Sequence, residues 1–136
     1  MSSLTGQVAL VTGSSRGIGA AIARTFAAHG AAVAVHGRDA AALTGVRDDI
    51  ERTGGRAVAV TAELTRFAEI ERIRAEIERQ LGPVTRLVAN AGGSATRPMP
   101  FEEIDEHDWR ASIDGNLTAT FLTLKCFLPG MKARRT

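Results

Sequence analysis

The sequence contains no tyrosine, one tryptophan and one cysteine, and aromatic residues make up only 4% of it. Because Cys126 is alone, no disulfide can form within the chain, and nothing favours an exported protein. No apolar run approaches the roughly 20 residues that a membrane-spanning helix requires. The net charge is only +2, and the one tight basic cluster, residues 132–135, lies at the chain end. We therefore expect a soluble, cytoplasmic protein with neither a membrane nor a nucleic-acid partner.

The 136 residues do contain an alternation of short apolar runs with longer segments of helical periodicity. The apolar runs, which predict strands, cover residues 8–11, 31–36, 57–61 and 84–89. Strands that read as continuous apolar runs are buried on both faces, as in a parallel sheet between two layers of helices. We therefore predict a single α/β domain with a doubly wound, Rossmann-type parallel sheet, of which the first four strands are present in the order 3-2-1-4.

The last predicted helix begins after Asp105, whose side chain can cap its N-terminus. Apolar side chains recur along one face of this helix, at Trp109, Ile113, Leu117, Phe121, Leu124 and Leu128. Trp109 is expected to anchor the helix. Packing in the core and packing against another subunit explain this apolar face equally well.

A glycine-rich segment from Thr12 to Gly19 joins the first predicted strand to the first predicted helix. Gly13 permits a tight turn, Gly17 lets the backbone approach a pyrophosphate, and Gly19 lets the helix pack close to the strand. The helix N-terminus would offer free N–H groups and a partial positive charge to phosphates. This position in the fold favours a nucleotide-binding site over the alternative, a glycine-rich turn that binds nothing.

The glycine spacing, Gly-x-x-x-Gly-x-Gly, and three segments of the chain resemble the short-chain dehydrogenase/reductase family. Residues 4–13 resemble the start of the family, the Asn-Ala-Gly at 90–92 a motif after its fourth strand, and the Asp-Gly-Asn-Leu at 114–117 a motif in the following helix. The resemblance covers essentially the whole chain and is greatest to the 3-oxoacyl-acyl carrier protein reductase group. Another doubly wound protein, such as a methyltransferase or a flavodoxin-like domain, is the alternative.

The resemblance implies a set of residues that bind a nicotinamide cofactor: Gly13, Ser15, Arg16, Gly17, Ile18, Gly19, Arg38, Glu63, Leu64, Asn90, Ala91 and Gly92. The family usually has Asp where this chain has Glu63, and that position and the aliphatic Leu64 would contact the adenine. Asn90 would brace the central sheet. The small residues after it would let the cofactor ribose lie close.

The end of the second strand predicts which cofactor is bound. An NAD site needs a carboxylate there, whereas an NADP site needs a cation that faces the 2′-phosphate. In the family's pattern the acidic position falls near Gly37, and Arg38 follows it, while Arg16 resembles the second basic residue of NADP-preferring members. Two guanidinium groups bind phosphate well, so we predict NADP rather than NAD. Alternatively, Arg38 is a solvated loop residue, and Asp39 caps the next helix or binds ribose.

Asn116 is the most informative polar residue of the last helix. It lies near the apolar face, where an unpaired buried amide costs about 1–3 kcal/mol. Gly115 beside it costs about 1 kcal/mol relative to alanine in a helix interior. Two locally unfavourable residues together favour a functional site. In the family that the chain resembles, this Asn belongs to a catalytic tetrad and holds a water of the proton relay; the alternative is an amide bonded to a nearby backbone carbonyl.

The resemblance also implies chemistry for which this sequence lacks most of the groups. Members of the family transfer a hydride between the nicotinamide and a carbonyl or alcohol carbon, with a Ser and a Tyr-x-x-x-Lys motif acting on the substrate. Of the tetrad only Asn116 is present, because the chain has no Tyr. We therefore predict that residues 1–136 are the N-terminal part of one NAD(P)-binding domain whose catalytic C-terminal part is absent.

The function predicted from the sequence is that of an NADP-dependent oxidoreductase acting on a small carbonyl or alcohol, homo-oligomeric in its full-length form. This chain alone is not expected to be active. The alternative is a non-catalytic half-domain that binds NADP as a binding or partner module. No metal is expected, since no cluster of Cys and His has ligand spacing. His29, His36 and His107 are not expected to be catalytic.

Overall fold

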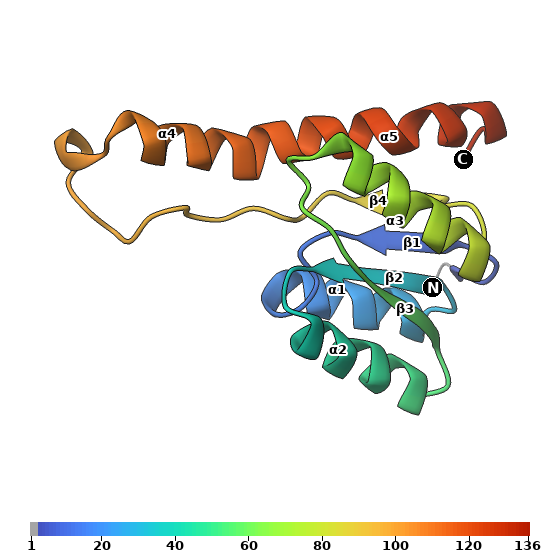
Figure 1. Ribbon diagram of the computed structural model, residues 1–136. Coiled ribbons are helices and arrows are strands. Elements are labelled where there is room, and N and C mark those ends of the chain that lie inside the picture. Colours follow the sequence, from blue (N-terminus) through green and yellow to red (C-terminus); the bar gives the residue numbers. More distant parts are fainter. Residues whose placement is uncertain (1–2) are drawn as a thin grey trace.

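A computed structural model describes residues 3–136 as a four-stranded parallel sheet with helices on both faces (Figure 1). The strands are β1 (Val8–Val11), β2 (Ala32–Gly37), β3 (Arg56–Thr61) and β4 (Arg86–Val88). Their order in the sheet is β3-β2-β1-β4, which confirms the predicted order and fold class. The register pairs Ala9 with Val33 on one side and with Arg86 on the other. The first strand therefore lies inside the sheet, and β4 lies at one edge.

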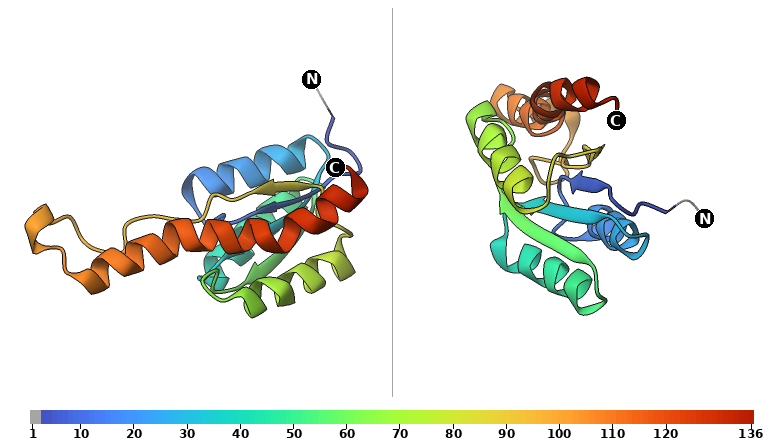
Figure 2. Two further views of the ribbon diagram at one scale, coloured as in Figure 1. Left: turned by 90° about the horizontal axis from the view of Figure 1, so that it is seen from above. Right: turned by 90° about the vertical axis from the view of Figure 1, so that its right-hand side faces the viewer.

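Alternate residues of the strands point to opposite faces, so the sheet separates two apolar cores. On one face Val33 and Val35 pack with α1 (Gly17–Ala28) and α2 (Ala40–Arg52). On the other face Leu10 and Val58 pack with α3 (Phe67–Gln80) and α5 (Ala119–Arg134). Figure 2 shows these helices in two layers with the sheet between them. Because both faces are covered, the strands read as continuous apolar runs, as the sequence predicted.

The strand bounds differ from the predicted ones by one residue at each end of β2 and at the start of β3, and by more at β4. The predicted run 84–89 contains only the three residues of β4. Residues on this strand are only half-buried or exposed, because β4 has a neighbour, β1, on one side only. A strand with one partner makes fewer ladder hydrogen bonds, so its ends leave the sheet early.

The last predicted helix is divided by a π-helical turn. Asp105 accepts a hydrogen bond from the Asp108 N–H at 2.8 Å, which confirms the predicted cap of α4 (Glu106–Ile113). The π turn η2 (Asp114–Thr118) follows, and α5 continues in the same direction past Pro129. A short 3-10 turn, η1 (Phe101–Glu103), precedes the cap.

The apolar face predicted for this helix is not buried in the core. The side chains of Trp109, Leu117 and Phe121 are 58%, 66% and 59% exposed. Leu124 and Leu128 are also exposed, and Ile113 is half-buried. A different set of α5 residues is buried, namely Ala119, Thr123, Cys126 and Phe127. The extra residue of a π turn changes the helical phase, so one face does not continue from α4 into α5. Trp109 therefore does not anchor the helix to the sheet, and the core explanation of this face is wrong.

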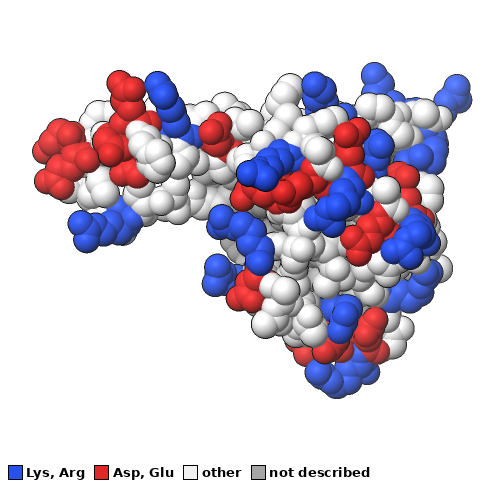
Figure 3. Space-filling model, viewed as in Figure 1, with Lys and Arg blue, Asp and Glu red and all other residues white. Residues whose placement is uncertain are grey.

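Among residues 3–136, no helix combines the length and the apolar character that a bilayer crossing requires. Figure 3 shows positive and negative side chains interspersed over the face that carries α3, with acidic side chains gathered at the far end of α4. The acidic residues there include Glu102, Glu103 and Glu106, from η1 and the first turn of α4.

Candidate cofactor site at the carboxyl end of the sheet

A hollow of about 970 Å³ lies where the strands of the sheet end. It is lined by segments that follow each of the four strands, and by the π turn. Eight of the predicted cofactor residues line it: Gly13, Ser15, Arg16, Arg38, Glu63, Leu64, Ala91 and Gly92. The carboxyl edge of a doubly wound sheet is where such folds bind ligands. The tertiary structure thus brings together residues that are up to about eighty positions apart in the chain.

The glycines of the first loop have three different surroundings. Gly13 adopts φ +64°, and a Cβ on it would lie 2.8 Å from the Ala91 Cα. A Cβ on Gly19 would overlap the Gly13 carbonyl, because α1 begins directly against the turn. A Cβ on Gly17, at φ +59°, would meet no atom within 4 Å. Gly13 and Gly19 are therefore required by close packing, whereas Gly17 leaves its backbone open to a ligand.

Asn90 lies behind the glycine loop rather than in the hollow. Its Nδ2 donates to the carbonyls of Thr12 and Gly13 at 3.1 and 3.0 Å. The Thr12 hydroxyl accepts from the N–H groups of Asn90 and Ala91 at 3.0 and 2.9 Å. These bonds join the ends of β1 and β4, so the loop is held in its turn from the side of β4. Asn90 and Gly19 thus shape the site from outside it, and Ile18 is 75% exposed in the first turn of α1.

The positively charged groups of the rim come from two loops. Arg16 and Arg38 are both exposed, and neither forms an ion pair with any residue from 3 to 136. Arg16 precedes α1 without a side-chain hydrogen bond to the helix. Asp39, in contrast, accepts a hydrogen bond from the Ala42 N–H at 3.0 Å and caps α2. The carboxylate beside Arg38 therefore has a structural partner, and two guanidinium groups remain available to an anion.

Glu63 and Leu64 lie on the β3 side of the hollow. Leu64 is buried in the core that α3 and α5 cover. The Glu63 N–H donates to the carboxylate of Glu69 at 2.7 Å, which holds the start of this loop against α3. Where the family that the sequence resembles usually has Asp, this chain therefore has the acidic side chain of Glu63 at the rim, on a loop that is hydrogen-bonded to α3.

Sequence reasoning did not find the structural role of His36. Its ring lies under the glycine loop, 3% exposed, with Nδ1 accepting from the Gly13 N–H at 3.3 Å and Nε2 3.0 Å from the Ala62 carbonyl. Burial holds the pKa of His36 below its ordinary value of 6.5, although the Ala62 carbonyl and the charge of Glu63 oppose that shift. The available signal was a lone titratable residue in an otherwise apolar strand that ends at the site.

Asn116 joins the π turn to the loop after β4. Its Nδ2 donates to the carbonyls of Gly93 and Ser112 at 2.9 and 2.8 Å, and its Oδ1 accepts from the Gly93 N–H at 2.9 Å. A Cβ on Gly92 would lie 2.5 Å from that oxygen. The amide is thus bonded to nearby backbone, and the predicted place of Asn116 in a catalytic tetrad stays a prediction. The side chain holds the loop with three hydrogen bonds, and Asp114 and Gly115 of the same turn line the hollow.

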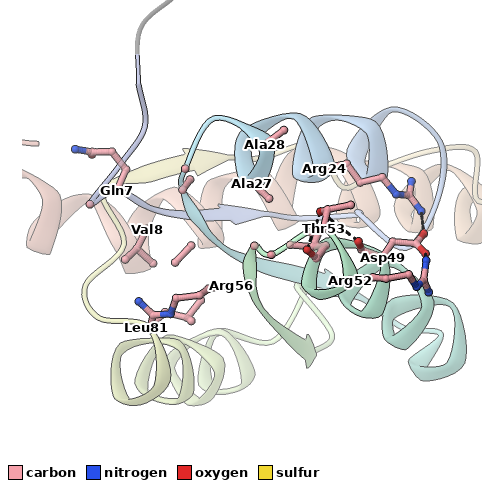
Figure 4. A pocket seen from close by; sticks show the side chains of 17 residues that line it. Gln7, Val8, Arg24, Ala27, Ala28, Asp49, Arg52, Thr53, Arg56 and Leu81 are labelled. Carbon is pink, nitrogen blue, oxygen red and sulfur yellow. Dashed lines mark hydrogen bonds and ion pairs between the residues drawn. The ribbon is translucent and has the colours of Figure 1, made fainter.

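A second hollow, of about 870 Å³, lies at the opposite end of the sheet (Figure 4). None of the predicted site residues lines it. Asp49 of α2 bridges Arg24 of α1 and Arg52 at 2.8 and 2.9 Å, and these two partners lower the pKa of its carboxyl group. The helices α1 and α2 end here, and helix C-termini carry partial negative charge. Arg24 and Arg52 are thus paired with Asp49. The third arginine of this hollow, Arg56, donates to the Gln80 carbonyl at 3.5 Å, so this end offers less to an anion.

One group among residues 3–136 brings potential metal ligands together: Asp105, His107 and Asp108 have ligand atoms within 4.8 Å of one another. The carboxylate of Asp105 already caps α4, and His107 lies 3.7 Å from the Asp108 carboxylate. The group is therefore explained as a helix cap on an acidic surface.

The comparisons with known proteins define the class. The family model for short chain dehydrogenases matches residues 7–136, so the chain belongs to the short-chain dehydrogenase family. A hydroxynaphthalene reductase-like protein Arp2 of Metarhizium robertsii is 41% identical over 120 residues, which cover 88% of this chain and 44% of that protein. The name of this relative does not point to the 3-oxoacyl-acyl carrier protein reductase group, so that narrower resemblance stays a prediction.

Solved structures agree with this family. A metagenomic short-chain oxidoreductase, crystallised with NADP, has a TM-score of 0.90 and 39% identity and covers 98% of this chain and 60% of its own. A blue fluorescent protein from a metagenomic library, crystallised with NADPH, has a TM-score of 0.84 and 35% identity, with coverages of 96% and 53%. The chain thus spans about half the length of the proteins that it matches.

Proposed function

We propose that this chain is the cofactor-binding part of an NADP-dependent oxidoreductase of the short-chain type. When bound, NADP would supply the hydride donor or acceptor for a carbonyl or alcohol carbon of a small molecule. Membership of the short-chain dehydrogenase family supports this proposal, as do two related structures that contain NADP or NADPH. The hollow at the carboxyl end of the sheet has the size and chemistry that such a cofactor needs.

The observation that carries the proposal is the pair of uncommitted guanidinium groups at the rim. Arg16 and Arg38 line the same hollow from two different loops, and the carboxylate of Asp39, which follows Arg38 in the chain, caps α2. Guanidinium groups pair with phosphate oxygens in bidentate geometry. A cofactor with a 2′-phosphate satisfies both charges, whereas one with a free 2′-hydroxyl leaves them unused. This supports NADP over NAD.

The residues that would hold the cofactor follow from the geometry of the loops. The bare backbone at Gly17 and the first N–H groups of α1 would receive the pyrophosphate. Glu63 and Leu64 would border the adenine, and Ala91 and Gly92 the nicotinamide ribose. We assign Gly13, Gly19 and Asn90 to shaping the loop and Ser15 and Ile18 to its rim.

The remaining groups of the reaction would come from outside this sequence. A proton must reach the carbonyl oxygen as the hydride reaches its carbon, and this requires a positioned acid such as Tyr. The chain has no Tyr and spans 44% of its relative from Metarhizium robertsii, which supports an assignment of residues 1–136 to the N-terminal part of one domain. Asn116 is the member of the catalytic tetrad that this part would supply, to hold a water of the proton relay, and its bonds to Gly93 would fix the loop after β4.

We also propose that the full-length protein is a cytoplasmic homo-oligomer. The exposed apolar side chains of Trp109, Leu117 and Phe121 support the oligomer, because large apolar side chains on a surface favour contact with another chain. The single cysteine, which is buried, supports a reducing compartment.

The sharpest test of the proposed function is the substitution Arg38→Ala. A charge-assisted hydrogen bond is worth about 1.5–3 kcal/mol, so the Kd for NADP+ should rise by about ten- to a hundredfold. The Kd for NAD+, which has no 2′-phosphate, should change by less than about threefold. Isothermal titration of the purified chain with each cofactor measures both values.

The matched control is Arg56→Ala, which removes a guanidinium at the other end of the sheet, where it lines the second hollow. The Arg56→Ala variant should bind both cofactors with the affinity of the wild-type chain. An equal loss of NADP+ and NAD+ binding in the Arg38 variant contradicts the assignment of Arg38 to the 2′-phosphate. A wild-type chain that binds neither cofactor contradicts the proposed function itself.

A further inference from the structure

His36 lies near the end of β2, between the segment that follows β1 and the segment that follows β3. On the side of β1, the Gly13 N–H reaches the Nδ1 of its ring at 3.3 Å. On the side of β3, Nε2 lies 3.0 Å from the Ala62 carbonyl oxygen. Ala62 directly precedes Glu63 at the rim of the hollow. One buried ring therefore touches the two segments that border the cofactor site on opposite sides.

The two contacts determine which form of the imidazole is present. A backbone N–H is a donor only, so Nδ1 must accept and carries no proton. A carbonyl is an acceptor only, so Nε2 must donate and carries the proton. Both bonds exist together only in the neutral ring protonated on Nε2. An imidazolium would place a second donor against the Gly13 N–H and would break that contact.

Both the N–H and the carbonyl of Gly13 are thereby hydrogen-bonded to side chains. Asn90 donates to the Gly13 carbonyl at 3.0 Å from the side of β4, and His36 receives the Gly13 N–H from the side of β2. The neighbouring Ser14 is tied to the backbone of His36 through its own N–H and hydroxyl, at 2.8 and 2.9 Å. Those backbone ties do not involve the imidazole. The ring therefore orients the glycine turn without being needed to form β2.

We propose that His36 is a positioning residue of the cofactor site: its neutral, Nε2-protonated ring holds the Gly13 turn and the Ala62 segment in the arrangement that binds NADP. This inference rests on the proposed function. It predicts that acidification weakens cofactor binding through this ring, beyond the effect on the phosphates of the ligand.

The charges around the ring are few, which makes this titration interpretable. Glu63, from the segment after β3, favours the charged ring, and Arg38, after β2, disfavours it. On the side of β1 the ring meets Gly13, which is uncharged. Burial is the largest effect and, with Arg38, outweighs the Ala62 carbonyl and Glu63, so the pKa of His36 is lowered and the neutral ring is favoured.

The first experiment measures the tautomer directly. Long-range ¹H–¹⁵N correlation spectra of the labelled chain at about pH 7.5 distinguish the two neutral tautomers from the imidazolium. The signals of the three histidines are assigned with the single variants His29→Phe and His107→Phe. We expect His36 to be protonated on Nε2 alone. A ring protonated on Nδ1, or a charged ring, overturns the proposal. This measurement uses the wild-type fold and needs no cofactor.

The second experiment compares His36→Phe with the control His107→Phe, which alters an exposed ring on α4. The His36 variant keeps the ring volume but loses both polar contacts, so its Kd for NADP+ at about pH 7.5 should rise about tenfold. Between about pH 7.5 and pH 5.5 the wild-type and His107→Phe chains should lose more affinity than the His36 variant. The 2′-phosphate titrates near pH 6, but it contributes equally to all three chains.

The outcomes separate the two proposals. A folded His36→Phe chain that binds NADP+ within twofold of wild type, or that shows the same acid weakening, contradicts the role of His36. If the wild-type and control chains bind no NADP+, the proposed function fails, and the tautomer measurement still decides how the ring is bonded. If His36→Phe does not fold, two measurements decide the question. One is the tautomer of His36 in the wild-type chain, and the other is the loss of NADP+ affinity on acidification in the wild-type chain compared with a His36→Asn variant.

Discussion

The sheet and its covering helices contrast with the projecting segment of residues 94–118, which we call the arm. The two faces of the sheet bury two apolar cores against α1, α2, α3 and α5. In the arm, which contains α4 and the π turn, no residue is buried (Figure 1). Both regions contain amphipathic helices, but only the helices that pack on the sheet have their apolar faces covered. A helical pattern in the sequence thus predicts that a helix forms, whereas its burial depends on which other elements are present.

Besides the continuous helix backbone from the π turn into α5, side-chain hydrogen bonds of Asn116 join the two regions. Asn116, on the π turn, binds both polar groups of the Gly93 backbone, and its third bond goes to Ser112. These bonds lie beside the hollow that Gly92 and Asp114 line. The cofactor site therefore has one wall on the rigid sheet and one wall at the root of the arm.

The largest expected difference between the two regions is in stability. Ile73 of α3 is fully buried, so Ile73→Ala should lower the free energy of unfolding by about 2–5 kcal/mol. Leu117 of the arm is 66% exposed, so Leu117→Ala should change it by no more than about 0.5 kcal/mol. Urea unfolding of the dilute chain measures both. A comparable loss in the Leu117 variant would break the contrast, because it would mean that another chain covers the arm in solution.

A smaller effect is expected where the regions join. Asn116→Ala removes three hydrogen bonds, each worth about 0.5–1.5 kcal/mol, and should open the Gly93 N–H to exchange. Hydrogen exchange at Gly93 should accelerate, while amides of β1 stay protected. Ser112→Ala is the matched control, since Asn116 uses the backbone carbonyl of that residue. Unchanged exchange at Gly93 in the Asn116 variant would show that the loop is held by other contacts.

The smallest expected effect depends on pH and belongs to the sheet alone. Burial lowers the pKa of His36, so below its ordinary value of 6.5 the unfolded chain binds a proton that the folded chain does not. Stability should therefore be complete above pH 6.5 and fall on acidification, by at most about 1.4 kcal/mol per pH unit. The lowered pKa of Asp49 acts only at lower pH, below its ordinary value of 3.8.

Urea unfolding at several pH values from about 7.5 down to 5 tests whether stability falls on acidification. This range lies above the pH at which most carboxyl groups titrate. Replacement of His36 by Phe should flatten the profile, and replacement of His107 in the arm should leave it unchanged. A profile that stays steep in the His36 variant would assign the acid sensitivity to another group.

Much of the sheet could be predicted because its residues carry their own local reasons. The run at 8–11 is apolar throughout, and Gly13 and Gly19 occupy positions where a Cβ has no room. Asp105 and Asp39 each cap the helix that follows. The apolar period and the helix caps depend on neighbours in the chain, so they are readable without the fold. The glycines were readable from their spacing, whereas the crowding of Gly13 by Ala91 is a tertiary contact.

The site was predictable in part. The residues that line the hollow follow strands of a known order, and parallel strands bring their carboxyl ends to one edge. The ring contacts of His36 could not be predicted, since they join the turn at Gly13 to Ala62, far away in the sequence. The bonds of Asn116 to Gly93 likewise depend on how the arm folds back.

The sequence by itself determined the alternation of strands and helices, the glycine turn and the two arginines at its rim, because periodicity, backbone sterics and charge are local properties. Only the tertiary structure decided which face of the last helix is buried. The π turn shifts the phase of that helix, and the sheet reaches only α5. Apolar side chains such as Leu117 and Phe121 therefore stay exposed, since burial requires a partner at the right place and not a pattern alone.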